Sequence, residues 1–118
     1  MGLYRESITK EAVSALEGGE VVLGPRDLTV MPRRTLVFAC AAGEGKLGLA
    51  AAKVQVGPTV AGPWLDEDIG ATIPTLAAGA AAAYRMDKAD PFVRVLATAA
   101  TPGEGEQTDL TIYLEALG

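Results

Sequence analysis

The sequence predicts an all-β fold, a single antiparallel β-sandwich or jelly roll of about seven or eight short strands. From residue 20 onward, brief apolar runs alternate with segments rich in Gly, Pro and Asp, which are typical of turns and loops. No long helical pattern alternates with these runs, which argues against a parallel α/β sheet. We therefore assign residues 20–118 to one sandwich domain. Its candidate strands are EVVLGP, DLTVMP, TLVFACAA, LGLAAAKVQVGP, ATIPTL, FVRVLATAA and DLTIYLEAL.

Residues 1–19 differ from the rest and are predicted to form an N-terminal arm or a short helix. Thr9 could cap a helix over the segment KEAVSALE, which Gly18 and Gly19 would end. Two interpretations stay open here. The segment either packs locally or frays, or it forms an arm that lies on a neighbouring subunit.

The alanine-rich stretch at residues 75–90 is ambiguous between strand and helix. Alanine is the best helix former, and Thr75 and Pro91 could bound a helix. Gly79 interrupts that pattern, however, and the flanking segments read as strands. We favour a strand over residues 80–86.

The segment PFVRVLATAA, residues 91–100, reads as a strand with two faces that are both fit for burial. We expect DLTIYLEAL, residues 109–117, to be its antiparallel partner. One face of this hairpin would close the core, and Arg94 could pair with Glu115 on the other face, at ~0.2–1 kcal/mol. The core face would comprise Val93, Val95 and Ala97 with Leu110, Ile112 and Leu114.

The second face of this predicted hairpin is the candidate interface. It combines aromatic, aliphatic and arginine side chains, a composition typical of protein–protein contacts. The alternative interpretation is that this face is an ordinary amphipathic surface with no partner. The candidate interface residues are Phe92, Arg94, Leu96 and Tyr113, with Tyr4 and Ile8 of the N-terminal arm as the next candidates.

Composition excludes several classes of partner and compartment. The net charge is −5 and no basic stripe is present, so nucleic acid is not expected as a partner. No apolar run is long enough to cross a membrane, and the first residues show no secretion signal. The single cysteine, Cys40, lies in an apolar run and is expected to be a buried, inert thiol.

We expect no enzymatic activity, no cofactor and no metal site. The chain contains no histidine, which excludes Ser-His and Cys-His catalysis. The segment around Gly45-Lys46 lacks both the first glycine and the Ser or Thr of a phosphate-binding loop. The acidic run LDEDIG, with Asp66, Glu67 and Asp68, is expected to be a solvated turn, with weak calcium binding as the lesser alternative.

Four segments together resemble small virion proteins of tailed bacteriophages: KVQVGPTVAGPW, GATIPTLAAGAAAAYRMD, PFVRVLATA and the final TDLTIYLEA. The resemblance covers roughly residues 35 to 117. It implies a β-sandwich subunit of the virion, assembled in the host cytoplasm, that decorates or stabilises the capsid or connects a head fibre. The implied partners are other copies of the chain, a capsid protein or another virion protein. The family offers no catalytic residues to transfer.

A small ligand-binding sandwich, such as a carbohydrate-binding module, is the alternative function. Carbohydrate sites usually present exposed aromatic platforms, and Trp64 is the only tryptophan. Its position after Gly62-Pro63 favours packing within a loop.

Overall fold

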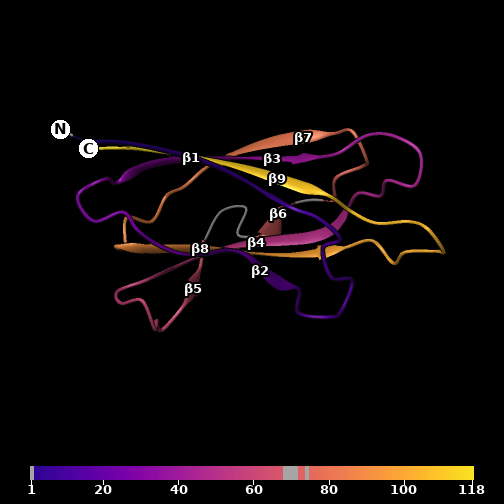
Figure 1. The fold of residues 1–118 in the computed structure, drawn as a ribbon. Coiled ribbons are helices and arrows are strands. Elements are labelled where there is room, and N and C mark those ends of the chain that lie inside the picture. Colours follow the sequence, from indigo (N-terminus) through magenta and orange to yellow (C-terminus); the bar gives the residue numbers. More distant parts are fainter. Residues whose placement is uncertain (1, 68–71, 74) are drawn as a thin grey trace.

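A computed structural model describes residues 2–67, 72–73 and 75–118 and confirms the all-β class (Figure 1). The described residues form nine strands and no helix. The strands lie in two facing sheets, as in a sandwich. Their bounds are β1 Leu3–Lys10, β2 Glu20–Asp27, β3 Arg33–Cys40, β4 Leu49–Gly57, β5 Leu65–Asp66, β6 Thr72–Ile73, β7 Ala81–Arg85, β8 Phe92–Ala99 and β9 Leu110–Leu117.

The strand order is that of a jelly roll. The first sheet has the order β1-β9-β3-β7, and the second has the order β2-β8-β4-β5 with β6 also on β4. The two-residue strands β5 and β6 pair with β4 at different registers and together fill one strand position. The antiparallel pairs β1·β9, β2·β8, β3·β7 and β4·β5 therefore nest like the two arms of one long hairpin rolled up.

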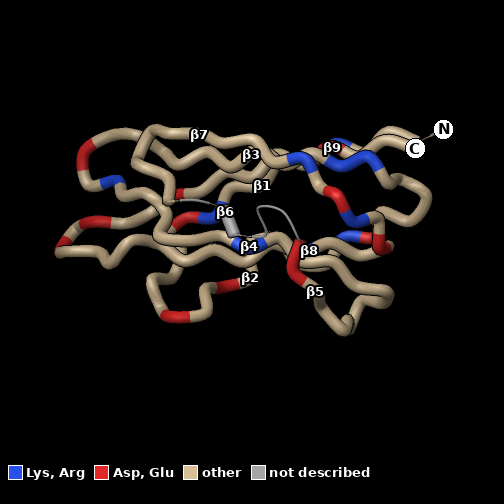
Figure 2. Tube along the Cα trace, turned by 180° about the vertical axis from the view of Figure 1, so that it is seen from behind, with Lys and Arg blue, Asp and Glu red and all other residues tan. Residues whose placement is uncertain are grey.

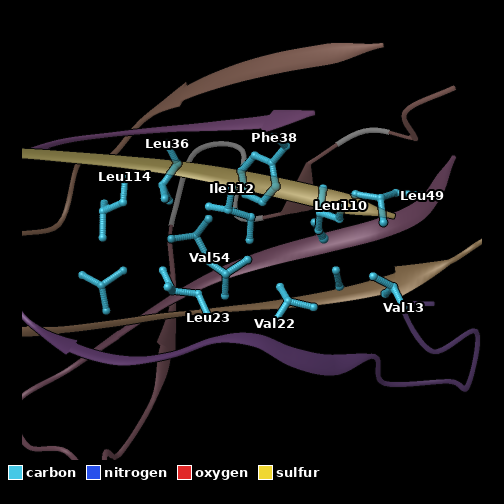
Figure 3. Close-up of a cluster of buried hydrophobic side chains, with 14 of the residues drawn as sticks. Val13, Val22, Leu23, Leu36, Phe38, Leu49, Val54, Leu110, Ile112 and Leu114 are labelled. Carbon is cyan, nitrogen blue, oxygen red and sulfur yellow. The ribbon is translucent and has the colours of Figure 1, made fainter. Parts of the chain in front are cut away.

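The core lies between the sheets and is built by alternation that is regular along β3, β8 and β9 and is interrupted by register shifts in β2 and β4. The inward side chains of β8 and β9, such as Val95 and Ile112, are all no more than 4% exposed. Figure 3 shows Phe38 and Ile112 of the first sheet facing Val54 of the second. Each fully buried aliphatic side chain contributes ~1.5–3 kcal/mol, so this apolar interior is the main source of stability.

The predicted hairpin of β8 with β9 is wrong, because the two strands lie in opposite sheets. Their connection, residues 100–109, is longer than a tight hairpin turn and crosses from one sheet to the other. Both strands contribute to the predicted core face. Their outer faces, in contrast, lie on opposite sides of the sandwich.

The predicted N-terminal arm or short helix is replaced by a strand. β1 pairs with β9 from Leu3 to Lys10, so it is an edge strand of the first sheet. Tyr4 and Ile8 alternate with exposed residues, which is a strand period. The segment KEAVSALE is irregular beyond Lys10, and its one buried residue, Val13, donates its N–H to the Thr108 carbonyl at 2.9 Å. A helix this short has little stability of its own.

The alanine-rich stretch is a strand, as favoured from its neighbours. β7 pairs with β3, with Ala82 opposite Phe38 and Tyr84 opposite Leu36. Alanine's helix propensity is a weak preference that pairing with a buried strand overrides. β7 forms one edge of the first sheet and β1 the other.

Candidate interaction surfaces

The outer face of the first sheet centres on Tyr113, which is 49% exposed. Ser7 of β1 and Val37 of β3 lie beside it in register. Both neighbours have shorter side chains than the tyrosine. An open groove of about 550 Å³ runs alongside, lined by residues that include Thr35 and Glu115. A partner's backbone could approach this face closely.

The predicted pairing of Arg94 with Glu115 does not form, because the two residues lie on opposite outer faces. The Arg5 Nε instead donates to the Glu115 carboxylate at 2.8 Å across β1 and β9. Both side chains are exposed, so this ion pair adds ~0–1 kcal/mol. Nearby, the hydroxyls of Thr9 and Thr111 lie 2.9 Å apart.

The outer face of the second sheet is partly covered by the chain itself. The Arg94 guanidinium lies 4.4 Å from the centre of the Trp64 ring, and its Nε donates to Gln55 at 2.8 Å. The Gln55 amide in turn donates to Asp66 at 2.8 Å. A Cβ at Gly57 would lie 3.2 Å from the Trp64 ring, so the glycine leaves room for it. The expected loop-packing role of Trp64 is confirmed.

The structure brings some of the predicted interface residues together and separates others. Phe92, Arg94 and Leu96 share the outer face of β8, all partly buried. Tyr113 lies on the opposite outer face. Tyr4 and Ile8 point inward from β1 and pack against the core. The expectation of one continuous patch is therefore wrong.

An ion pair closes the sandwich at the edge formed by β1 and β2. Arg26 of the second sheet donates through Nε and Nη2 to the two carboxylate oxygens of Glu6 in the first sheet, at 2.7 and 2.9 Å. The Tyr4 hydroxyl adds a hydrogen bond to the same carboxylate at 2.5 Å. The hydrogen bonds from Arg26 hold the pKa of Glu6 below its usual value of 4.5. Burial and the neighbouring Glu6 raise the pKa of Tyr4.

Glu6→Gln should lower the free energy of unfolding by ~1 kcal/mol at neutral pH, because the partly buried pair is bidentate. A carboxyl group whose pKa is lower in the folded state stabilises the fold at pH values above its unfolded-state pKa. This stabilisation is lost as the pH falls through the folded-state pKa. The difference between wild type and variant should therefore shrink below about pH 4.5. Urea melts over a pH series measure it. Exposed Glu11→Gln is the control, and a pH-independent difference would contradict the assignment.

Arg34 is a buried charge that reasoning from the sequence missed. It is 1% exposed, and its guanidinium donates to the carbonyls of Met31, Asp90 and Leu28 at 2.8, 2.5 and 3.0 Å. It therefore ties the β2–β3 turn to the β7–β8 loop. Burial lowers the pKa of the guanidinium, and the charges of Asp90 and Glu67 oppose this shift. Arg34 shares the strand phase of Leu36, the one signal that could have revealed it.

Glu67 corrects the prediction of a solvated acidic turn. Its side chain is fully buried, whereas Asp66 beside it is exposed. The Glu67 carboxyl accepts from the Tyr84 hydroxyl at 3.0 Å and from the backbone N–H groups of Asp87 and Lys88 at 2.7 and 3.1 Å. The turn is thus anchored to the chain after β7. Asp68, the third acid of the run, lies outside the described residues.

Cys40 is buried, as expected, and burial raises the pKa of its thiol. The described residues contain no cluster of three or more His, Cys, Asp or Glu side chains that could hold a metal ion. Within the same residues, no helix is long and apolar enough to cross a membrane.

No protein-family model and no curated protein matches the chain in sequence. Among solved structures, one from work on Bacillus endospore appendages, described as a family of disulfide-linked pili, aligns with 98% of this chain and 89% of its own. The TM-score is 0.44 and the sequence identity is 14%. Values this low say nothing about function, and the jelly-roll assignment depends on the strand order alone.

Proposed function

We propose that the protein is a non-enzymatic structural subunit of a tailed-phage virion. In this role it decorates or stabilises the capsid, or connects a head fibre, through contacts with other proteins. The observation that carries the proposal is the nested strand order, because jelly rolls recur in viral capsid proteins. This is an argument by fold analogy, which the resemblance of residues 35 to 117 to virion proteins supports independently. The proposed partners are copies of itself, a capsid protein or another virion protein.

The outer face of the first sheet is the proposed contact surface. Tyrosine is enriched at interface centres, where a large ring anchors the contact and small neighbours allow close approach. Tyr113 among Ser7 and Val37 fits that description, and its ring is half exposed. Phe92, on the opposite face, is already partly buried within the chain and has less surface to offer.

The arrangement around Trp64 favours this structural role over carbohydrate binding. A sugar-binding platform needs an open indole face on which a sugar ring can stack. Here the Arg94 guanidinium occupies one face, and the backbone at Gly57 lies against the ring. Jelly rolls also occur in lectin domains, so the covered face of Trp64, and not the strand order, is the feature that weighs against the carbohydrate alternative.

Virions of the phage that encodes this chain should contain it in a fixed ratio to the major capsid protein, as measured by quantitative mass spectrometry after gradient purification. Tyr113→Ala should lower that occupancy at least tenfold, because truncating an anchor of this kind costs ~2 kcal/mol or more. The fold should survive, since the side chain points away from the core. Phe92→Ala on the opposite face is the matched control. Absence of the protein from purified virions would overturn the proposal.

A further inference from the structure

Charge is distributed unevenly along the molecule. Three loops, residues 11–19, 41–48 and 100–109, lie at the end where β1, β3 and β8 finish. They contain six carboxylates and one lysine, so they carry the whole net charge of −5. Figure 2 shows these acidic loops at the end of the molecule away from the two termini. The remainder of the chain is neutral on balance.

Two of these loops are joined to each other and form one acidic tip, which comprises Glu44, Glu104 and Glu106. The loops are joined by hydrogen bonds from Leu47 to Gln107 and from Gln107 to Gly45, both 2.9 Å. The charge of Lys46 is satisfied by Asp109 at 2.5 Å, leaving the three glutamates of the tip exposed. A tip held by its backbone loses little entropy when it binds.

The opposite end carries a groove of about 380 Å³, formed on the first sheet near the termini. Its charged lining residues are Arg33, Arg34, Arg85 and Glu115, and the Glu115 carboxylate is already paired with Arg5. Arg33 and Arg85 are exposed, and neither forms an ion pair with a carboxylate of the described residues. Arg33 donates only to the Gly118 carbonyl, at 2.6 Å. On an acidic protein, the exposed charges of Arg33 and Arg85 in this groove are therefore not neutralised by any carboxylate in the part of the chain that the structure describes.

We infer that the groove at Arg33 and Arg85 binds the acidic tip of a second copy, so that subunits join head to tail. The observation that selects this occupant is charge complementarity between two ends of one chain, with guanidinium groups that can accept carboxylates in paired hydrogen bonds. Such a contact joins different surfaces of identical subunits and generates rings or filaments. This inference deepens the proposed structural role by naming one partner and its contact.

The contact should be weak and sensitive to salt. The molecule measures 45 × 25 × 21 Å between Cα extremes, so an end face is smaller than the ~800 Å² per partner of a standard stable interface. Association then depends on charge, which is screened over ~10 Å at 0.1 M ionic strength.

Charge reversal tests the inference. In sedimentation velocity at about 20 mM salt, the wild-type sedimentation coefficient should rise with concentration up to about 1 mM protein, and about 500 mM salt should abolish the rise. R33E/R85E and E44R/E104R should each weaken self-association at least tenfold. An equimolar mixture of the two should restore association, because each reversed end then meets its complement. K53E, which reverses an exposed lysine on the other sheet, is the control and should behave as wild type.

If the wild-type protein stays monomeric at about 1 mM in low salt, the inference is overturned, and the groove does not bind a second copy of the chain. Association that neither double variant weakens, or that the mixture does not restore, would overturn it as well. Virion occupancy is a separate readout. Self-association without incorporation into virions would contradict the proposed function alone, and incorporation without self-association would contradict only this inference.

Discussion

Arg34→Ala should lower the free energy of unfolding by ~3–5 kcal/mol, the range expected when one partner of a buried charged network is removed. The substitution removes the side-chain donor from the carbonyls of Met31 and Asp90, and the Leu28 carbonyl keeps only its hydrogen bond from the Met31 N–H. Unpaired buried carbonyls each cost ~1–3 kcal/mol, and the lost side-chain volume adds to this. Chemical denaturation followed by circular dichroism measures the change.

Arg33→Ala is the matched control, since it removes the same side chain from the neighbouring, exposed position. We expect it to change stability by less than ~1 kcal/mol. Arg34→Lys should recover only part of the loss, because a lysine ammonium cannot reproduce the planar fork of donors. Equal destabilisation by Arg33→Ala and Arg34→Ala would contradict the role assigned to Arg34.

Glu67→Ala should destabilise by ~3–5 kcal/mol and Glu67→Gln by ~1–3 kcal/mol. The amide is nearly isosteric, but it replaces one acceptor oxygen with a donor. Because both carboxylate oxygens accept backbone N–H groups, from Asp87 and Lys88, either orientation of the amide leaves one N–H facing another donor. Glu67→Gln loses hydrogen bonding at nearly constant side-chain volume, whereas Glu67→Ala loses both. Comparison of the two variants therefore separates the two contributions.

Asp66→Asn makes the same chemical change one residue earlier, where the side chain is exposed. It should cost less than ~0.5 kcal/mol. Native-state hydrogen exchange adds a local test, since the Asp87 and Lys88 amides should lose protection in Glu67→Gln. Unchanged protection of both amides would show that Glu67 does not anchor this segment.

Local pattern predicted the strands well but not their partners. The alternation at residues 92–99 and 110–117 identified both core faces correctly, because a strand's two-residue period can be read from the sequence. Pairing in a jelly roll joins segments far apart in sequence, and neighbours in the chain often belong to opposite sheets. The β8–β9 hairpin was a reasonable local guess that this topology excludes.

The buried charges escaped prediction for a different physical reason. Glu67 is the middle acid of the run LDEDIG, and nothing in that run distinguishes it as the residue that becomes buried. Its donors come from Tyr84 in β7 and from the segment just after β7, about twenty residues away, so only the folded chain brings them together. Arg34 is two residues before Leu36 and therefore lies on the inward face of β3. In the sequence, however, the adjacent arginines Arg33 and Arg34 are typical of an exposed surface.

The place of β9 in the first sheet has a consequence for synthesis on the ribosome. β9 lies between β1 and β3, yet it is the last of the described strands to be translated. Until it emerges, β1 has no neighbour in its sheet and one side of β3 is an open edge that could pair with another chain. The fraction of nascent protein that aggregates would then depend on how rapidly β9 pairs with β1 and β3, or on a chaperone that shields these edges.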